Sequence, residues 1–232
     1  MLYTQYNREE RNICAHLFRV LHCPNEDYKI LREFIGTSKL INQFDIFSEV
    51  ALIRDAYHFR EKNKSNFIDN IVKIIIEQEN VKNCRLYSEL PSILNNGRKT
   101  HPLQIRQKAK SKGFSLTLDE NRVYGSLQGM FNAKPDLAIF LEDLVLVYEA
   151  KLTQNFNIQQ LNRTQNIVEV WTRLLYNDLG YNSSPEYKIL KLGIKKSNPD
   201  ISWERIVDIV SSVLPKDDKS YLTMSSVIKA CC

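Results

Sequence analysis

The chain has 232 residues, a formal net charge of +5, and ordinary proportions of hydrophobic (43%) and charged (25%) residues. This length allows a sizeable core, and no apolar run approaches the roughly 18 residues that would span a bilayer. The first residues lack the layout of a secretory signal, and the five cysteines form no disulfide or CxxC pattern, so we expect a cytoplasmic protein with reduced thiols and no membrane partner.

The first third of the chain predicts helices. Apolar residues recur at helical spacing in four segments, which are residues 7–23, 26–36, 42–60 and 65–80. Pro24 ends the first segment, and Gly36 ends the second. Residues 1–90 are therefore expected to form a mostly helical N-terminal part of a single domain.

The middle of the chain predicts a sheet. Residues 91–102 have the Asn, Gly and Pro content of a loop. Phe114, Leu116 and Leu118 then alternate with polar residues, and strand character resumes from Val123, which predicts a hairpin. The remaining elements are a second hairpin at 136–152, a helix at 158–179, a strand at 187–194 and a helix at 202–214. Residues 110–200 would thus form the sheet core, and 201–232 a C-terminal helix and tail.

Basic residues concentrate in one stretch with few acidic neighbours: Arg98, Lys99, His101, Arg106, Lys108, Lys110 and Lys112. Such a stretch is either a solvated loop or helix face, or a surface that contacts phosphates. Both interpretations stay open. The second makes Arg98, Lys99, Arg106 and Lys108 candidate nucleic-acid contacts.

A group of metal-ligating residue types occurs near the N-terminus, where Cys14 and His16 precede His22 and Cys23. Residues 14 and 16 lie about 200° apart on a helix, so one helical turn cannot present both to the same ion. We therefore predict no zinc site here.

The segment Lys134 to Leu152, KPDLAIFLEDLVLVYEAKL, has two apolar runs separated only by Glu142 and Asp143. If this break is the centre of an antiparallel hairpin, residues whose numbers add to 285 face each other. Asp136 then opposes Glu149, with Cβ atoms roughly 4.5–5.5 Å apart. Lys151 lies on the same face, and Ala150 points away. Because both faces are otherwise apolar, the hairpin is expected inside a sheet covered by helices on both sides.

Two opposed carboxylates at a buried sheet end destabilise a fold unless a cation offsets their charge. Mg²⁺ and Mn²⁺ suit carboxylate ligands, and such an ion can polarise a phosphoryl oxygen and generate hydroxide from water. Lys151 would add positive charge beside the reacting groups. The alternative is that Asp136 merely begins a strand and that Glu149 and Lys151 are a solvated strand end. The Pro before Asp136 and the flanking helices favour a site for phosphodiester hydrolysis.

Pro135-Asp136, twelve intervening residues and Glu149-Ala150-Lys151 together resemble the signature of the PD-(D/E)XK nuclease superfamily. The order helix, three strands, helix, strand, over about residues 114–195, is similar to the core of that superfamily. The resemblance implies an α/β (α+β) fold with a restriction-endonuclease-like core, in which a central mixed sheet is flanked by helices. It also implies an endonuclease or exonuclease that depends on Mg²⁺ (or Mn²⁺).

The resemblance assigns roles to individual residues. Asp136 and Glu149 would ligate the metal together with the Ala150 carbonyl, and Lys151 would position or activate the attacking water. Many members add a glutamate from an early helix, for which Glu10 is the candidate and Glu9 and Glu77 are alternatives. Some members carry a glutamine on the helix after the lysine strand and a tyrosine four residues later. Gln159 and Gln160 occupy the place of the glutamine, but Arg163 and Thr164 stand where the tyrosine would be. This departure speaks against a specific exonuclease assignment.

Gln160 and Arg163 are expected to share one face of their helix and to contact a phosphate. The implied partner is nucleic acid, with DNA favoured over RNA, and a homodimer or a partner subunit stays open. By analogy, the role would be prokaryotic or phage defence or DNA processing. The competing hypothesis is a catalytically silent nuclease-like module that binds nucleic acid or a protein partner. A metal-dependent rise in melting temperature would separate the two.

Overall fold

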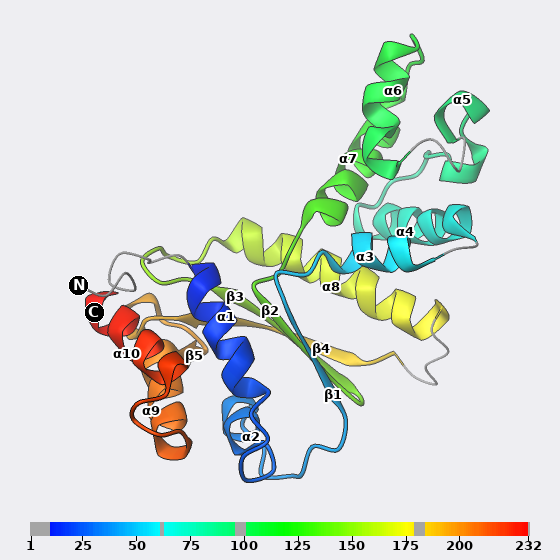
Figure 1. The fold of residues 1–232 in the computed structure, drawn as a ribbon. Helices are drawn as coiled ribbons and strands as arrows, with labels where there is room; N and C mark the ends of the chain where they lie inside the picture. Colours follow the sequence, from blue (N-terminus) through cyan, green and yellow to red (C-terminus); the bar gives the residue numbers. More distant parts are fainter. Residues whose placement is uncertain (1–9, 61–62, 96–100, 179–183, 232) are drawn as a thin grey trace. The chain divides into compact units, whose positions relative to one another are not determined.

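The computed structural model describes residues 10–60, 63–95, 101–178 and 184–231, and the chain forms two compact units (Figure 1). Unit 1 consists of Met1–Val50, Pro135–Gln165 and Pro185–Cys232. Unit 2 consists of Ala51–Lys134 and Asn166–Ser184. Each unit is therefore assembled from segments that are distant in the sequence, and unit 2 interrupts unit 1 twice.

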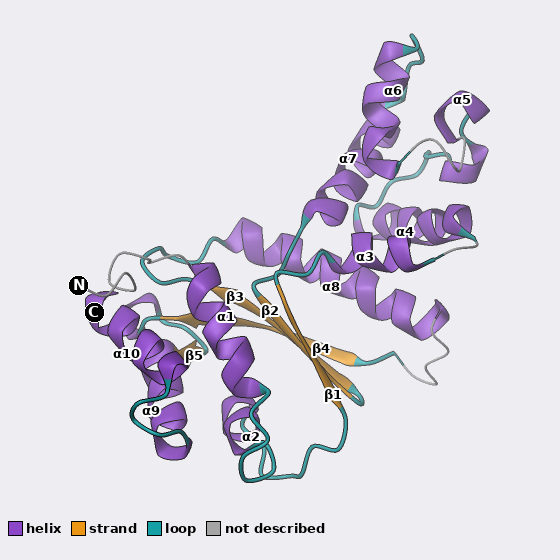
Figure 2. Ribbon diagram, in the orientation of Figure 1, coloured by secondary structure: helices purple, strands orange, loops and turns teal. Residues whose placement is uncertain are grey.

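Unit 1 contains a five-stranded mixed sheet flanked by helices (Figure 2). The strands, in their order across the sheet, are β1 (Phe44–Ser48), β2 (Leu137–Leu141), β3 (Leu144–Ala150), β4 (Glu186–Gly193) and β5 (Ile201–Ser202). β2 is antiparallel to both β1 and β3, whereas β4 is parallel to both β3 and β5. The prediction of a mixed sheet with flanking helices is therefore confirmed.

The β2–β3 hairpin has the predicted register. Leu137 pairs with Tyr148 and Ile139 pairs with Leu146, so the numbers of paired residues add to 285. Odd-numbered residues of β2 and even-numbered residues of β3 belong to one core cluster. Val145 and Val147 are also fully buried, on the opposite face. This alternation puts Glu149 and Lys151 on the face opposite to Ala150, as predicted.

Four helices cover the Ala150 face of the sheet: α1 (Glu10–Leu21), α2 (Lys29–Ile35), α9 (Trp203–Val213) and α10 (Lys219–Cys231). Trp203 is the largest fully buried side chain, and its Nε1 donates a hydrogen bond to the Lys151 carbonyl at 3.1 Å. The core therefore fixes the backbone of Lys151 directly. The predicted tail after residue 214 is wrong, since residues 219–231 form α10 with Met224 and Val227 buried.

The predicted helix over residues 42–60 is wrong in its first half. Residues 44–48 form β1, and the helix α3 (Leu52–Phe59) starts only afterwards. Ile46 is buried opposite Ile139, and Asp45 between its apolar neighbours is exposed, which is the period-two pattern of a strand. Three apolar side chains are too few to separate this period from that of a helix. The predicted core range of 114–195 therefore lacks its first strand.

The described part of unit 2 contains helices and no strand. After α3 come α4 (Lys64–Gln78), η2 (Tyr87–Glu89), α5 (Ser92–Asn95), η3 (Pro102–Gln104), α6 (Ile105–Ser111) and α7 (Leu118–Asn132). The unit boundary then falls within α8 (Ile158–Asp178). The predicted loop at 91–102 is partly wrong because of α5, and residues 96–100 lie outside the described ranges. In those ranges, no helix is long and apolar enough to cross a membrane.

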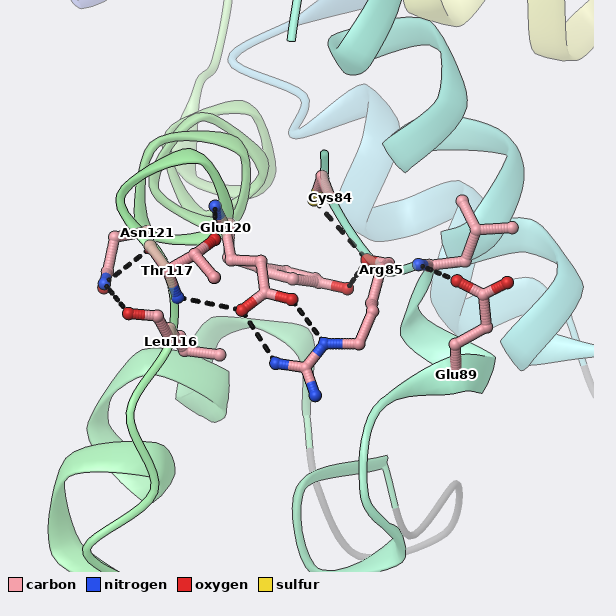
Figure 3. A network of polar contacts seen from close by, with 9 residues as sticks. Cys84, Arg85, Glu89, Leu116, Thr117, Glu120 and Asn121 are labelled. Carbon is pink, nitrogen blue, oxygen red and sulfur yellow. Dashed lines mark hydrogen bonds and ion pairs between the residues drawn. The ribbon is translucent and has the colours of Figure 1, made fainter. Parts of the chain in front are cut away.

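The predicted hairpin from Phe114 onward is wrong, because its second half is α7. Thr117 caps this helix: its hydroxyl accepts the Glu120 N–H at 3.1 Å, and the Glu120 carboxylate accepts the Thr117 N–H at 2.9 Å (Figure 3). This capping box begins a helix whose buried face carries Val123 and Leu127. Leu118, which completes the misleading alternation, is 91% exposed.

Arg85 completes the same network in unit 2. Its Nε and Nη2 donate to the two carboxylate oxygens of Glu120, at 2.5 and 2.9 Å (Figure 3). This hydrogen bonding is the main cause of the lowered pKa of Glu120, which is only 1% exposed. A lowered folded-state pKa means that the ion pair stabilises the fold above the ordinary carboxyl range, and that this contribution is lost as pH falls.

Arg85→Met is therefore expected to lower the free energy of unfolding at neutral pH by about 2 kcal/mol, because it leaves a buried carboxylate without its cation. The partial exposure of Arg85 keeps the effect below that of a fully buried pair. Urea unfolding at pH 7 and pH 4 measures this, with the exposed Lys82→Met as the control. The difference from wild type should shrink at pH 4, and equal stability of the two variants at pH 7 would contradict the assignment.

Candidate functional site

Asp136, Glu149 and Lys151 lie at the same end of β2 and β3, all within unit 1. The Asp136 carboxylate accepts the Ala150 N–H at 2.7 Å, so this side chain lies against the β3 backbone between the other two residues. The charges of Asp136 and Lys151 both act on Glu149. The structure therefore brings together the three residues that the sequence singles out.

The Glu149 carboxylate is held from α8. Thr164 Oγ1 donates to Oε1 at 2.5 Å, and Gln160 Nε2 donates to Oε2 at 2.6 Å. Thr164 and Gln160 are four residues apart, so both reach from one face of the helix. Glu149 is only 5% exposed. These two donors fix the orientation of a carboxylate that has little access to solvent.

Burial raises the pKa of both Asp136 and Glu149. For Asp136 the Ala150 N–H and the Lys151 charge act against this, and for Glu149 the Thr164 hydroxyl is the main opposing contribution. The negative charge of Asp136 raises the pKa of Glu149 further. A nearby cation would lower the electrostatic free energy of both carboxylates, whereas without one their charges repel in a poorly solvated place.

The backbone of Lys151 is fixed on both sides. Its N–H donates to the Leu192 carbonyl at 2.8 Å, and its own carbonyl accepts from Trp203. Among the described residues, Lys151 takes part in none of the ion pairs. The ammonium group is therefore carried by a rigid strand end and is not neutralised by a described carboxylate.

Of the three candidate helix glutamates, Glu10 is the one whose described contacts link it to this centre. It begins α1, its carboxylate accepts the Leu152 N–H at 3.3 Å, and its charge raises the pKa of Asp136. Glu77 belongs to unit 2, where it pairs with Arg173 at 2.7 Å. Glu9 lies outside the described residues.

Glu49 is a site residue that the sequence analysis missed. It directly follows β1, and continuing the register in which Ser48 pairs with Leu137 sets it beside Asp136. Its charge raises the pKa of Asp136, and Arg11 pairs with it at 3.3 Å. The backbone of Glu49 is left-handed, with φ 55°, which is uncommon for glutamate. An acid directly after an alternating apolar stretch could have predicted this residue. The helix predicted over residues 42–60 concealed that pattern.

The residues predicted to contact nucleic acid belong to different parts of the chain. Arg163 is exposed on α8, while Gln160 points to Glu149 instead of being free for a phosphate. Arg106 and Lys108 lie on α6 in unit 2, and Arg98 and Lys99 fall in the undescribed range 96–100.

Cys14 and His16, two of the candidate zinc ligands, have different surroundings. Cys14 is fully buried in the core of unit 1, whereas His16 makes a 3.0 Å contact with Ser220. In the described ranges, no group of three or more His, Cys, Asp or Glu residues is arranged to hold a metal ion.

The donor set at the strand ends fits Mg²⁺ or Mn²⁺ better. It offers the carboxylates of Asp136 and Glu149, and the Ala150 N–H already points toward Asp136. In an extended strand the carbonyl of a residue points to the same side as its N–H, so the Ala150 carbonyl faces that side as well. Mg²⁺ commonly takes one or two carboxylates and keeps several waters.

Thr164→Val is expected to weaken Mn²⁺ binding by about tenfold, because partners that orient metal-ligating side chains typically contribute about 10–100-fold. Valine keeps the shape of threonine but removes the donor to Glu149 Oε1. Thr164→Ser keeps the hydroxyl and should bind Mn²⁺ as the wild type does. Isothermal titration calorimetry measures both, and equal affinities for the valine and serine variants would show that this hydrogen bond does not orient a ligand.

No protein-family model matches the chain, and searches of curated proteins and of solved structures return no match. The fold and the site define a mixed α/β protein with two carboxylates and a lysine on one face of its sheet. Any function assigned to it therefore depends on the chemistry of these residues.

Proposed function

We propose that the protein is a metal-dependent nuclease that hydrolyses phosphodiester bonds, with DNA as the favoured substrate. The observation that carries the proposal is the convergence of Asp136, Glu149 and Lys151 at adjacent strand ends, with Asp136 bonded to the Ala150 N–H. When α2 and the helices of unit 2 between β1 and β2 are left out, the order α1, β1–β3, α8, β4 also supports a PD-(D/E)XK, restriction-endonuclease-like core.

In this proposal Asp136, Glu149 and the Ala150 carbonyl hold Mg²⁺ or Mn²⁺. The bound ion supplies Lewis acidity toward the phosphoryl oxygen and lowers the pKa of a water ligand. Lys151 orients the attacking water and offsets the negative charge that develops on the phosphate. Gln160 and Thr164 keep the Glu149 carboxylate in one orientation. Glu10 holds the chain just after Lys151 through the Leu152 N–H.

A nuclease assay tests the proposal directly. Plasmid, linear duplex DNA, single-stranded DNA and RNA are incubated with Mg²⁺, with Mn²⁺ and with EDTA. Cleavage of at least one substrate is expected with either metal, and none with EDTA. The plasmid also separates endonuclease from exonuclease activity, because a closed circle has no ends. Absence of cleavage of all four substrates by folded protein would reject the proposal.

A catalytically silent nuclease-like module is the second candidate, and one observation favours it. Both oxygens of Glu149 already accept hydrogen bonds from the protein, as they would if this residue had only a structural role. Melting curves with and without Mn²⁺ separate the candidates, because a module without a metal site gains no stability from the ion.

The proposed function also implies a cellular location, a biological role and an oligomeric state. A role in prokaryotic or phage defence or in DNA processing is proposed by analogy with the family that the chain resembles. A cytoplasmic location is proposed because the first residues lack the layout of a secretory signal. A homodimer or a partner subunit would provide a second centre, so that both strands of a duplex could be cut in one binding event. Light scattering of the purified protein, with and without DNA, measures its oligomeric state.

A further inference from the structure

The net positive charge of the chain lies in unit 2. This unit has 16 Lys and Arg against 10 Asp and Glu, a formal net charge of +6. Unit 1 has 16 against 17, a net charge of −1. The two values add to the +5 of the whole chain. The candidate metal centre thus lies in a unit that is nearly neutral, and the excess of cations lies in the other.

Most described carboxylates of unit 2 form ion pairs or hydrogen bonds with other residues of the same unit. Among its described residues, the three shortest ion pairs are Arg85–Glu120 (Figure 3), Arg122–Glu79 and Arg173–Glu77, at 2.5, 2.6 and 2.7 Å. Two further acids accept backbone N–H groups: Asp69 from Ser88, and Glu89 from Leu86. Residues of α6 take no part in these contacts, so these carboxylates do not offset the charge of that helix.

Four cations gather on and just after α6. Arg106, Lys108, Lys110 and Lys112, here called the α6 patch, occur in a stretch without any acid between Glu89 and Asp119. Ile105 and Ala109 bury the opposite side of the helix. At helical spacing the first and third cations of the patch share one flank of the buried stripe, and the second and fourth share the other. The solvent side of α6 is therefore cationic on both flanks.

The Arg106 guanidinium lies close to the α7 backbone. It lies over Gly125 of α7, where an added Cβ would be 3.2 Å from Arg106 Nη1. None of the ion pairs between described residues includes Arg106. A guanidinium without a carboxylate partner suits the bidentate recognition of phosphate.

We infer that the α6 patch binds the phosphate backbone of nucleic acid, so that unit 2 supplies substrate affinity and unit 1 supplies the chemistry. The inference deepens the proposed nuclease function and rests on it. Repeated cations with no acid between them match a polyanion and make contacts that do not depend on base sequence. An anionic membrane fits less well, because interfacial helices insert an exposed apolar face, and the apolar residues of α6 are buried.

The test compares two variants with the same change in net charge. One carries Arg106→Gln, Lys108→Gln, Lys110→Gln and Lys112→Gln. The control carries four exposed lysines of unit 1 changed in the same way: Lys39→Gln, Lys188→Gln, Lys216→Gln and Lys229→Gln. Binding of a short labelled DNA duplex is measured in EDTA over a range of salt concentrations, and circular dichroism melts check that both variants fold.

The patch variant should bind DNA at least about tenfold more weakly. Each lost phosphate contact lowers the slope of log K against log salt by about 0.9, so a decrease of about 2–4 is expected. The control should stay within about twofold of wild type. If the quadruple variant fails to fold, the double variant Lys110→Gln/Lys112→Gln, at two exposed positions, should give about half the change in slope.

Wild-type affinity and slope in the folded patch variant would overturn the inference. So would an equal loss in the control, or patch-dependent binding to phosphatidylserine vesicles in place of DNA. Cleavage assays keep the two proposals apart. Patch-dependent DNA binding by a chain that cuts no substrate supports the inference and rejects the nuclease, whereas cleavage with patch-independent binding does the reverse.

Discussion

Lys151→Ala should reduce DNA cleavage by about two to three orders of magnitude, the usual effect of removing one preorganised charge or donor from a reacting centre. The fold should survive, because Lys151 contacts Leu192 and Trp203 through its backbone N–H and carbonyl. The charge of the side chain lowers the pKa of Asp136 and Glu149. Alanine therefore removes the cation without changing the strand end.

Single-turnover cleavage at saturating DNA measures this effect, and a Mn²⁺ melt shows whether metal binding persists. Lys188→Ala is the matched control, since Lys188 is an exposed lysine of the neighbouring strand β4. The control should cleave as the wild type does. Turnover at the wild-type rate by Lys151→Ala would end the assignment of this residue to the reaction.

Glu149→Gln should change stability in opposite directions with and without metal. In the absence of metal the variant should melt about 2–4 °C higher, if removing one buried charge beside Asp136 contributes about 1 kcal/mol. With Mn²⁺ it should show little or none of the rise in melting temperature expected for the wild type, because a ligand has been lost. A merely structural Glu149 would give lower stability in both conditions, since its hydrogen bonds to Thr164 and Gln160 would be disturbed.

The sign of the pH dependence follows from the raised pKa of Glu149. A carboxyl whose pKa is higher in the folded than in the unfolded protein favours folding when it is protonated. Its contribution is complete below the ordinary value of 4.5 and is lost as pH rises through the folded-state pKa. Without metal, Glu149→Gln should therefore become more stable relative to the wild type as pH rises through the folded-state pKa of Glu149.

Urea unfolding at pH 4, 5, 6 and 7 in EDTA measures the difference between the two proteins. Glu186→Gln serves as the control, because Glu186 is exposed at the start of β4. The control should show no growing difference from wild type. A Glu149→Gln advantage that is largest at pH 4 would mean that the environment of Glu149 stabilises its charged form.

The sequence by itself determined the centre of the site. Asp136, Glu149 and Lys151 belong to one hairpin, whose register depends only on a short polar break and on strand alternation. The helices α1, α2, α4, α8 and α9 were predictable for the same reason, since their apolar periodicity is local. The capping box at Thr117 is also a local signal, and the sequence analysis missed it because the alternation of Phe114, Leu116 and Leu118 favours a strand.

Only the tertiary structure decided which distant segments join this hairpin. β1 pairs with β2 although about 90 residues separate them, and that pairing sets Glu49 beside Asp136. Thr164 becomes part of the site because α8 brings its hydroxyl within hydrogen-bond distance of Glu149. The basic residues of α6 belong to unit 2, which the sequence did not separate from unit 1. A five-residue strand has almost no local signal of its own, because its stability comes from partners elsewhere in the chain.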